Sequence, residues 1–433
     1  MNYSGALAYL DRHINLEATA GRVDGLSLEK MRQLVTVLGD PQTAYPVVHI
    51  TGTNGKGSVA RMVSALLREH GLSVGTYTSP HLERINERLA WNLDPISDET
   101  FAAVIQELAD IESMLDHPPS YFELLTAGAF AWFAEIAVDV AVVEVGLLGR
   151  FDATNVADGA VAVITNIGQD HTDLEGDWRV AIASEKAGII KEGSTLVLGQ
   201  HDEALRPVFD AEGPAAVIDE GTDFEVTQEL AAFGGRLFGV RTPWDTYDEV
   251  FLPLYGSHQT TNAATAIAAT EAFFGRALDS DTVGAAFAGL TLPGRFEIMH
   301  RNPLVILDGA HNPDGARAAA ATLHDEFDIA GRIVMVVGLL RGRDPVEMLR
   351  ALGADQADVV IACTPDSPRA MGADELAAAA RGIPVMAEVV SNVGEAVGRA
   401  LAVATEDDAV FVTGSLYVAG AARAALRSLD DVA

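Results

Sequence analysis

A glycine-rich segment, Gly52-Thr-Asn-Gly-Lys-Gly-Ser58, has the residue types that point most directly to chemistry. It follows the apolar run Val47–Thr51 and precedes a helix-like pattern from Val59 to Glu69. In such a loop the backbone N–H groups and the helix N-terminus face an anion, and Lys56 adds a mobile positive charge. The spacing is shorter than G-x-x-x-x-G-K-[ST], and Gly57 precedes the serine. We therefore predict a loop that binds phosphates, with an ordinary glycine-rich turn as the alternative.

Three further polar residues, Ser79, Glu144 and His171, each follow a different predicted strand. Because the carboxyl ends of parallel strands meet at one edge of a sheet, we expect them to converge on the phosphate loop. Oxygen ligands suit Mg²⁺, with His as a borderline addition, and the Ser58 hydroxyl could join them. Taken singly, a Glu or His at a strand end is more often a surface or hydrogen-bonded residue. Their convergence favours a metal site.

The elements that position these residues alternate between apolar runs and longer helical patterns, which predicts an α/β fold with a parallel sheet. Residues 200 to 255 break this rhythm and predict a strand-rich flap, and Thr291-Leu-Pro-Gly-Arg295 resembles a hinge. We expect a first domain over residues 1–292 and a second, smaller α/β domain over 296–433. The predicted strands are Val47–Thr51, Val74–Thr78, Val138–Val145, Val161–Asn166, Leu304–Leu307, Ile333–Val337, Asp358–Cys363 and Ala409–Val412.

The charge balance excludes several classes of partner. The net charge is −33, from 62 acids against 29 bases, so nucleic acid and membrane partners are not expected. Either solubility or adaptation to high salt explains this acidity. A single cysteine, Cys363, cannot form an internal disulfide, and no run of 18 apolar residues occurs. We therefore expect a cytoplasmic protein.

Several short polar motifs follow one another along the chain. They are GTNGKGS at Gly52–Ser58, TSPHL at Thr78–Leu82, EVGLLGRFDATN at Glu144–Asn155, DHT at Asp170–Thr172, EKAGI at Glu185–Ile189, HQTTN at His258–Asn262, PGR at Pro293–Arg295, DGAHN at Asp308–Asn312 and TGS at Thr413–Ser415. In this order they resemble the motifs of the folylpolyglutamate and dihydrofolate synthase branch of the Mur ligase superfamily. One position departs from the family pattern: Leu148 stands where a second glycine is usual in the Glu-Val-Gly-Leu-Gly-Gly-Arg run, so the local geometry of this loop is not predicted.

The resemblance implies a P-loop-containing central ATPase domain followed by a Rossmann-like domain. It implies an ATP-dependent ligase that adds L-glutamate to dihydropteroate, to the γ-carboxylate of a reduced folate, or to both. A carboxylate is a poor electrophile, so ATP must first convert it to an acyl phosphate, with Mg²⁺ neutralising charge during transfer. A monomer is expected. A cell-wall Mur enzyme and a regulatory ATPase are the alternatives, but the GKGS, SPHL and DGAHN runs favour the folate branch.

The resemblance also assigns nucleotide and metal ligands. Ser79 and Glu144 would hold one Mg²⁺ and His171 a second, with K⁺ as a further candidate ion. Asn262 could instead be only a helix N-cap. Arg295 would reach the phosphates when the second domain closes over the first. The ATP-binding positions implied are Thr53, Asn54, Gly55, Lys56, Gly57, Ser58, Asn262, Arg295 and Asp308.

Substrate and catalytic positions follow in the same way. His311 and Ser415 would hold the incoming glutamate, although His311 could be a buried structural residue. Asp152 would contact the pterin or, equally well, cap its own loop. Lys186 matches a superfamily lysine that is carbamylated by CO₂, with an ordinary ion pair to an acid such as Glu185 as the alternative. The expected catalytic set is Lys56, Lys186, His171 and Glu144.

Overall fold

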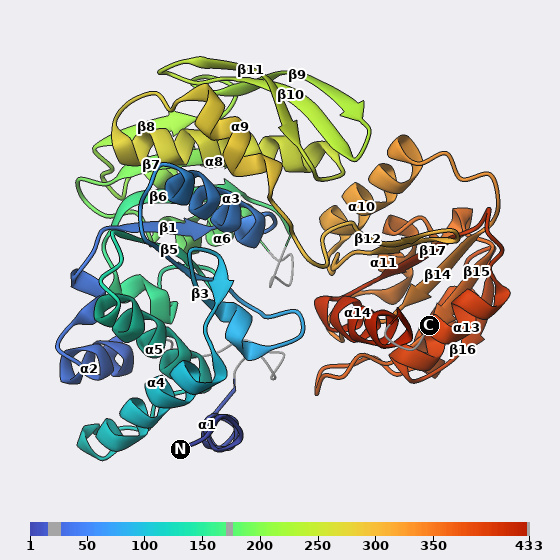
Figure 1. Ribbon diagram of the computed structural model, residues 1–433, viewed down its shortest axis with the longest axis horizontal. Coiled ribbons are helices and arrows are strands. Elements are labelled where there is room, and N and C mark those ends of the chain that lie inside the picture. Colours follow the sequence, from blue (N-terminus) through green and yellow to red (C-terminus); the bar gives the residue numbers. More distant parts are fainter. Residues whose placement is uncertain (16–26, 170–175, 431–433) are drawn as a thin grey trace. The chain divides into compact units, whose positions relative to one another are not determined.

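The computed structural model describes residues 1–15, 27–169 and 176–430 of the 433-residue chain and divides it into two compact units (Figure 1). The first contains the described residues up to Pro253 together with Gln259–Leu290. The second contains Leu254–His258 and the described residues from Thr291 onward. The sequence predicted one domain boundary, between residues 292 and 296, and gave no sign that Leu254–His258 belongs to the second unit.

A mostly parallel sheet forms the centre of the first unit. Its strands are rich in Val and Ile. Every residue of β1, β2 and β5 is buried, as expected where helices cover both faces of a sheet. Neighbouring strands pair in parallel along the order β2–β5–β1–β6–β7–β8. At the edge of the sheet, β3 pairs antiparallel with both β2 and β4. Within the described residues, the order is β4 (Asp94–Pro95), β3 (Leu89–Trp91), β2 (Val74–Tyr77), β5 (Val140–Glu144), β1 (Val47–Thr51), β6 (Gly159–Asn166), β7 (Thr195–Gln200) and β8 (Ala216–Asp219).

Helices pack on this sheet through two apolar clusters and through α3. One cluster joins α1, α2, α4 and α5 to the strands, and another joins α6 and α7 to β6 and β7. Helix α3 contacts β1, β2 and β5 and also packs on α9. The helices are α1 (Tyr3–Leu10), α2 (Glu29–Val37), α3 (Lys56–Glu69), α4 (Asp98–Ile111), α5 (Tyr121–Glu135), α6 (Trp178–Ala187), α7 (Arg206–Asp210), α8 (Ser257–Phe274) and α9 (Ser280–Ala288).

The predicted flap is shorter than the sequence suggested. A separate antiparallel sheet, β11–β10–β9, is built from β9 (Glu225–Ala232), β10 (Gly235–Arg241) and β11 (Thr246–Leu252). The preceding residues continue the βα rhythm instead, because α7 leads into β8, which pairs parallel with β7. Residues 201–215, where the sequence predicted the start of the flap, therefore form loops and short helical turns between β7 and β8.

The second unit is a smaller α/β layer, and the predicted fold class is confirmed. Within the described residues, its sheet runs β12 (Glu297–Arg301), β13 (Leu304–Leu307), β17 (Ala409–Thr413), β14 (Ile333–Val337), β15 (Val359–Ala362) and β16 (Met386–Val389). Among the strands that the structure describes in this unit, only β12 pairs antiparallel with its neighbour. The helices are α10 (Pro313–Glu326), α11 (Pro345–Ala351), α12 (Ala373–Ala380), α13 (Val393–Val403) and α14 (Leu416–Asp430).

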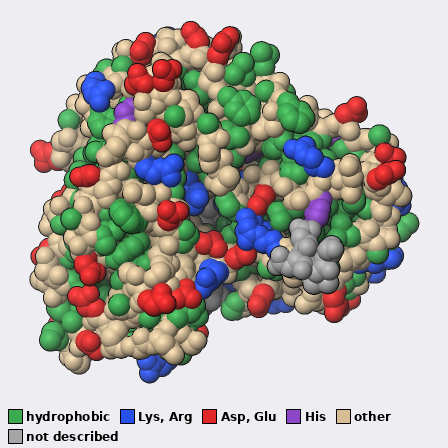
Figure 2. All heavy atoms as spheres, in the orientation of Figure 1, with side chains coloured by type: hydrophobic (Ala, Val, Ile, Leu, Met, Phe, Trp, Pro, Cys, Tyr) green, Lys and Arg blue, Asp and Glu red, His purple; other side chains and the backbone are tan. Residues whose placement is uncertain are grey.

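On the face drawn in Figure 2, Asp and Glu side chains are spread over the surface rather than gathered in one patch. None of the helices in the described part of the chain has the length and apolar character needed to cross a membrane.

One buried carboxyl group ties the flap to α8 and gives a testable pH dependence. The Tyr247 hydroxyl of β11 donates to Glu271 Oε1 of α8 at 2.6 Å and accepts from the Leu278 N–H at 2.7 Å. Burial, with a smaller contribution from Asp245, raises the pKa of Glu271 from 4.5 to about 7. Glu271 is therefore protonated in the folded protein at pH values where it ionises in the unfolded chain.

We predict that the free energy of unfolding contains a term that falls as pH rises from about 4.5 to 7. In that window the folded state binds the extra proton, so raising the pH favours unfolding. Glu271→Gln, which is neutral at every pH, should lack this term. Relative to wild type, its free energy of unfolding should improve by on the order of 2 kcal/mol between pH 5 and pH 7.5 in urea titrations. Two proteins with parallel pH profiles would contradict the assignment.

Candidate functional site

The phosphate loop predicted from the sequence leaves β1 in a conformation that requires glycine. Gly52 has φ 151°, and a Cβ there would lie 1.8 Å from Thr165 Oγ1 of the neighbouring strand β6. Gly55 has φ 81° and immediately precedes α3. The helix begins at Lys56 rather than at the predicted Val59, so its N-terminal N–H groups lie within the loop itself.

Two polar residues at the end of β6 hold this loop from behind. Asn166 accepts the N–H of Thr53 at its carbonyl, at 3.1 Å, and the N–H of Asn54 at Oδ1, at 3.0 Å. Thr165 Oγ1 donates to the Asn54 carbonyl at 2.5 Å. Neither residue was predicted from the sequence, although the position of Asn166 at the end of a predicted strand was a usable signal.

Two lysine ammonium groups reach the same backbone carbonyl of the loop. Lys56 Nζ donates to Gly52 O at 3.0 Å and to Thr53 O at 3.2 Å. Lys186 Nζ, from α6, donates to Gly52 O at 2.7 Å. The Lys186 residue is only 3% exposed, so it is not a surface lysine of the kind that the ion-pair alternative assumed. The fold therefore brings α6 to the phosphate loop.

The carboxylate of Glu144, at the end of β5, lies beside the start of α3. Glu144 is 4% exposed, and its Oε2 accepts the Ser79 N–H at 3.0 Å. A Cβ on Gly57 would lie 3.4 Å from the same oxygen, which places Glu144 next to the turn that carries Ser58. Three of the predicted metal ligands, Ser58, Ser79 and Glu144, are therefore brought to one edge of the sheet.

This donor set fits Mg²⁺, because hydroxyl and carboxylate oxygens are hard ligands. In the described part of the chain no group of three His, Cys, Asp or Glu side chains is arranged to hold a metal alone. A Mg²⁺ ion at Glu144 would therefore depend on serine hydroxyls, water and nucleotide phosphates for its other ligands. The remaining predicted ligand, His171, lies outside the described residues.

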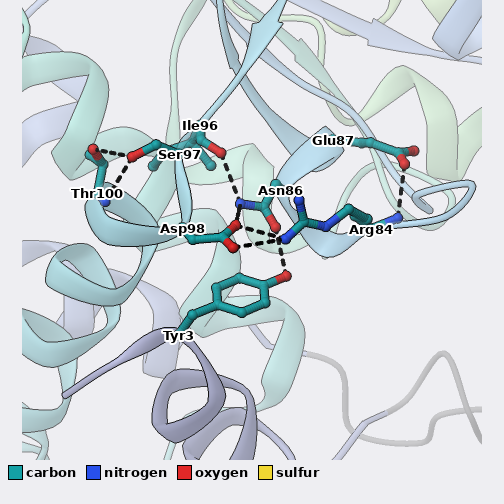
Figure 3. A network of polar contacts seen from close by, with 8 residues as sticks. All are labelled: Tyr3, Arg84, Asn86, Glu87, Ile96, Ser97, Asp98 and Thr100. Atoms are coloured by element: carbon teal, nitrogen blue, oxygen red, sulfur yellow. Dashed lines mark hydrogen bonds and ion pairs between the residues drawn. The ribbon is translucent and has the colours of Figure 1, made fainter.

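The loop that holds Ser79 is anchored to the N-terminal helix α1 and to α4 by the polar network in Figure 3. Arg84 Nη2 donates to both carboxylate oxygens of Asp98, at 2.7 and 3.0 Å. Asn86 accepts from the Tyr3 hydroxyl at 2.6 Å and donates to the Ile96 carbonyl at 2.8 Å. These bonds fix the segment that follows Ser79 while leaving the Ser79 N–H directed at Glu144.

The loop after Glu144 contains the departure from the family pattern. Leu148 has φ 60°, a left-handed conformation that glycine adopts freely and that costs a residue with a side chain roughly 1–2 kcal/mol. Its carbonyl accepts from Thr51 Oγ1, at the end of β1, at 2.6 Å. The usual glycine is explained by this backbone geometry, which the present chain keeps with a leucine.

Asp152 closes the same loop. Its Oδ1 accepts the Thr154 N–H at 3.0 Å, which makes it the N-cap of the short helix η5 (Ala153–Val156). Its Oδ2 accepts the Leu147 N–H at 2.8 Å. Burial raises the pKa of Asp152 above its ordinary value, although these hydrogen bonds lower it. The capping reading is therefore observed, and the pterin contact stays a prediction.

Asn262 lies against the phosphate loop. Helix α8 begins at Ser257, so Asn262 sits in its second turn and the N-cap alternative is wrong. Its Nδ2 donates to Gln259 Oε1 at 3.0 Å, and its Oδ1 would lie 2.4 Å from a Cβ on Gly55. The Asn262 amide thus occupies the space that the glycine leaves open.

The predicted residues of the second unit also gather at the carboxyl ends of its strands. Asp308 follows β13, and its carboxylate accepts the N–H groups of Phe296, at 3.0 Å, and Ala310, at 2.8 Å. Burial raises the pKa of Asp308, and the nearby Arg295 lowers it. A Cβ on Gly309 would lie 2.7 Å from Arg295 Nη1, so the guanidinium packs on this loop.

His311 and Ser415 lie on neighbouring loops of the same edge. His311 Nδ1 lies 3.1 Å from the Gly309 carbonyl, and the residue is partly exposed. Ser415 follows β17, which pairs with β13, and its hydroxyl accepts the Val418 N–H at 3.3 Å. Because His311 is partly exposed, the alternative of a buried structural histidine is not supported.

Comparison with known proteins agrees with this geometry. Residues 50–270 match the Mur ligase middle domain, and residues 294–416 match the Mur ligase glutamate ligase domain. The dihydrofolate synthase/folylpolyglutamate synthase of Mycobacterium tuberculosis is 40% identical, over 92% of this chain and 89% of that protein. The folylpolyglutamate synthase of the same organism, solved in complex with ADP, has a TM-score of 0.92 at 38% identity, with 98% of both chains covered. Escherichia coli FolC, solved with DHPP and ADP, has a TM-score of 0.86 at 29% identity, with 99% of both chains covered. The chain therefore belongs to the folylpolyglutamate synthase/dihydrofolate synthase branch of the Mur ligase superfamily.

Proposed function

We propose that this enzyme uses ATP to phosphorylate the carboxylate of dihydropteroate, of a reduced folate, or of both, and joins the acyl phosphate to the amine of L-glutamate. The observation that carries the proposal is the meeting of Lys56, Lys186 and Glu144 at the phosphate loop. A carboxylate beside a phosphate loop is common to nucleotide-binding proteins, but a loop that only bound a nucleotide would not need a second, buried lysine as well.

The first unit supplies the phosphoryl-transfer chemistry. Lys56 and the N–H groups at the start of α3 stabilise the phosphate charge, as in other phosphate loops. Ser58, Ser79 and Glu144 would hold Mg²⁺, with His171 as the proposed ligand of a second ion and K⁺ as a further candidate. When bound, Mg²⁺ neutralises negative charge between ATP and the acceptor carboxylate. Asn262 lies at Gly55 and would contact the nucleotide there.

The second unit supplies the amino-acid site. His311 and Ser415 lie at the carboxyl ends of adjacent strands, where open α/β sheets bind ligands. A glutamate held there would present its amine to the acyl phosphate, while Arg295 and Asp308 would act on ATP after domain closure. Asp152, which lies in the loop after Glu144, is the proposed pterin contact. We expect the enzyme to work as a monomer.

The decisive experiment is product mass spectrometry. The purified protein is incubated with ATP, Mg²⁺ and glutamate, and with dihydropteroate or a reduced folate offered separately. We expect the acceptor mass to increase by one glutamate residue, with release of ADP and phosphate. The acceptor used identifies whether the first glutamate, later ones or both are added. Phosphate release that is indifferent to both pterin and glutamate would instead indicate a simple ATPase.

Lys56→Ala is predicted to abolish ligation while leaving the fold intact. Lys56 Nζ contacts loop carbonyls rather than a core, and the residue is partly exposed, so its removal leaves no cavity. We expect kcat to fall by about 100-fold or more, the scale seen when one charge-stabilising donor is lost. The exposed Lys30 provides the control, since Lys30→Ala should keep normal activity. A near-normal kcat for Lys56→Ala would overturn the phosphate-loop assignment.

Lys186 is proposed to be carbamylated, which would turn its ammonium into a carboxylate on a long stem. Reaction of the neutral amine with CO₂ forms the carbamate and releases one proton. An arginine cannot react in this way. We predict that Lys186→Arg is as inactive as Lys186→Ala, and that short-chain carboxylates restore part of the activity of Lys186→Ala only.

The control is Lys191→Arg. Lys191 lies five residues away, donates to the Asn155 carbonyl at 3.3 Å, and should tolerate arginine. Full activity of Lys186→Arg would show that the residue acts only as a positive charge at Gly52, and the carbamate would be excluded.

A further inference from the structure

A histidine in the middle of β1 is buried where an apolar residue would be expected. His49 is fully buried and lies between Val143 of β5 and Ala162 of β6 in the sheet register. Burial, and to a lesser extent the charge of Lys191, lowers the pKa of His49 to about 3. The imidazole is therefore neutral at working pH. A buried polar ring costs free energy unless it is hydrogen-bonded, so its partners indicate why it is there.

His49 begins a series of hydrogen bonds that runs through Thr154 and Asp152. His49 Nε2 lies 2.9 Å from Thr154 Oγ1, and that hydroxyl donates its only proton to Asp152 Oδ1 at 2.5 Å. Thr154 must therefore accept from His49, which assigns the ring proton to Nε2. This agrees with His49 Nδ1, which has no hydrogen-bond partner among the residues that the structure describes.

This series of hydrogen bonds ends on the backbone of the loop that follows Glu144. Asp152 Oδ2 accepts the Leu147 N–H at 2.8 Å, one residue before the left-handed Leu148. From the other end, Thr51 Oγ1 donates to the Leu148 carbonyl at 2.6 Å. His49 and Thr51 are two residues apart on β1, so their side chains lie on the same face of the sheet. Strand β1 thus holds this loop at two points.

We infer that His49 is a positioning residue, which acts through Thr154 and Asp152 to hold residues 146–148 in the conformation required for binding the acceptor substrate. A left-handed leucine persists only where its surroundings determine the backbone. Here the hydrogen bonds to the Leu147 N–H and the Leu148 carbonyl hold the backbone. His49 orients the Thr154 hydroxyl, which in turn holds the Asp152 carboxylate that accepts the Leu147 N–H. The inference rests on the proposed function, because the loop lies between Glu144 and the proposed pterin contact Asp152.

Steady-state kinetics of paired variants test this role. His49→Leu and the nearly isosteric Thr154→Val remove the donor and the hydroxyl, respectively. Each should lower kcat/KM for the pterin acceptor by about tenfold, the effect of one net hydrogen bond, with KM for ATP nearly unchanged. His49→Gln should recover most of the loss, since its side-chain amide can donate to Thr154. A glutamine variant as impaired as the leucine variant, or an equal rise in KM for ATP, would refute the positioning role.

Amide hydrogen exchange tests the same chain without using activity. The Leu147 amide, which is bonded to Asp152, should exchange about tenfold faster in His49→Leu and Thr154→Val than in wild type and His49→Gln. Unchanged protection in a folded variant would refute the inference. If His49→Leu does not fold, Thr154→Val decides. If wild type ligates no pterin acceptor, the proposed function fails, and the exchange measurement still decides whether His49 holds the loop.

Leu148→Gly provides an independent check. Glycine adopts φ near 60° without strain, so the loop should then depend less on its anchors. We expect His49→Leu to cost less, both in kcat/KM and in Leu147 protection, in the Leu148→Gly background than in wild type. Fully additive effects of the two substitutions would contradict the coupling between His49 and this backbone.

Discussion

Strand β1 lies between β5 and β6, and this parallel pairing is the constraint on which the site depends. It places the phosphate loop, Glu144 and Asn166 at the carboxyl ends of three adjacent strands, so residues more than 100 positions apart become neighbours. The pairing also leaves no room for a side chain at Gly52, where Thr165 occupies the space. The loop is therefore shaped by the sheet beneath it, and α3 can begin at Lys56 with its N–H groups available to an anion.

Buried polar groups connect this edge to the elements around it. Lys186 of α6 donates a hydrogen bond to the Gly52 carbonyl, and Asn262 of α8 packs against Gly55. Groups of this kind are costly to bury, and hydrogen bonds offset that cost only in a narrow range of geometries. They therefore restrict the arrangement of the helices. This restriction suits phosphoryl transfer, where catalysis depends mainly on positioning and charge.

The sequence predicted the parts of this arrangement that follow from local pattern. Runs of Val and Ile located β1, β2, β5 and β6 of the first sheet and β13, β14, β15 and β17 of the second, but not the other strands of either sheet. Ser79 and Glu144 could be singled out because they are polar residues close after two of these predicted strands. Asn262 looked like a possible helix N-cap because Ser257 and His258, where α8 begins, carry no apolar periodicity. The role of His49 was invisible for a different reason. A histidine within an apolar run has no periodic signal, and its partner Thr154 is 105 residues away.

Leu148 shows how far local preference can be overridden. A leucine disfavours the left-handed region, so sequence alone argues against the backbone that the structure has. The hydrogen bonds of Thr51 to its carbonyl and of Asp152 to the preceding N–H are both made to backbone atoms, so they do not depend on which side chain stands at this position. A glycine there would make the conformation easy to reach, whereas the leucine makes the conformation depend on those bonds. It also removes the alternative backbone states that a glycine would populate, so the loop beside Glu144 is more rigid once β1 and Asp152 hold it.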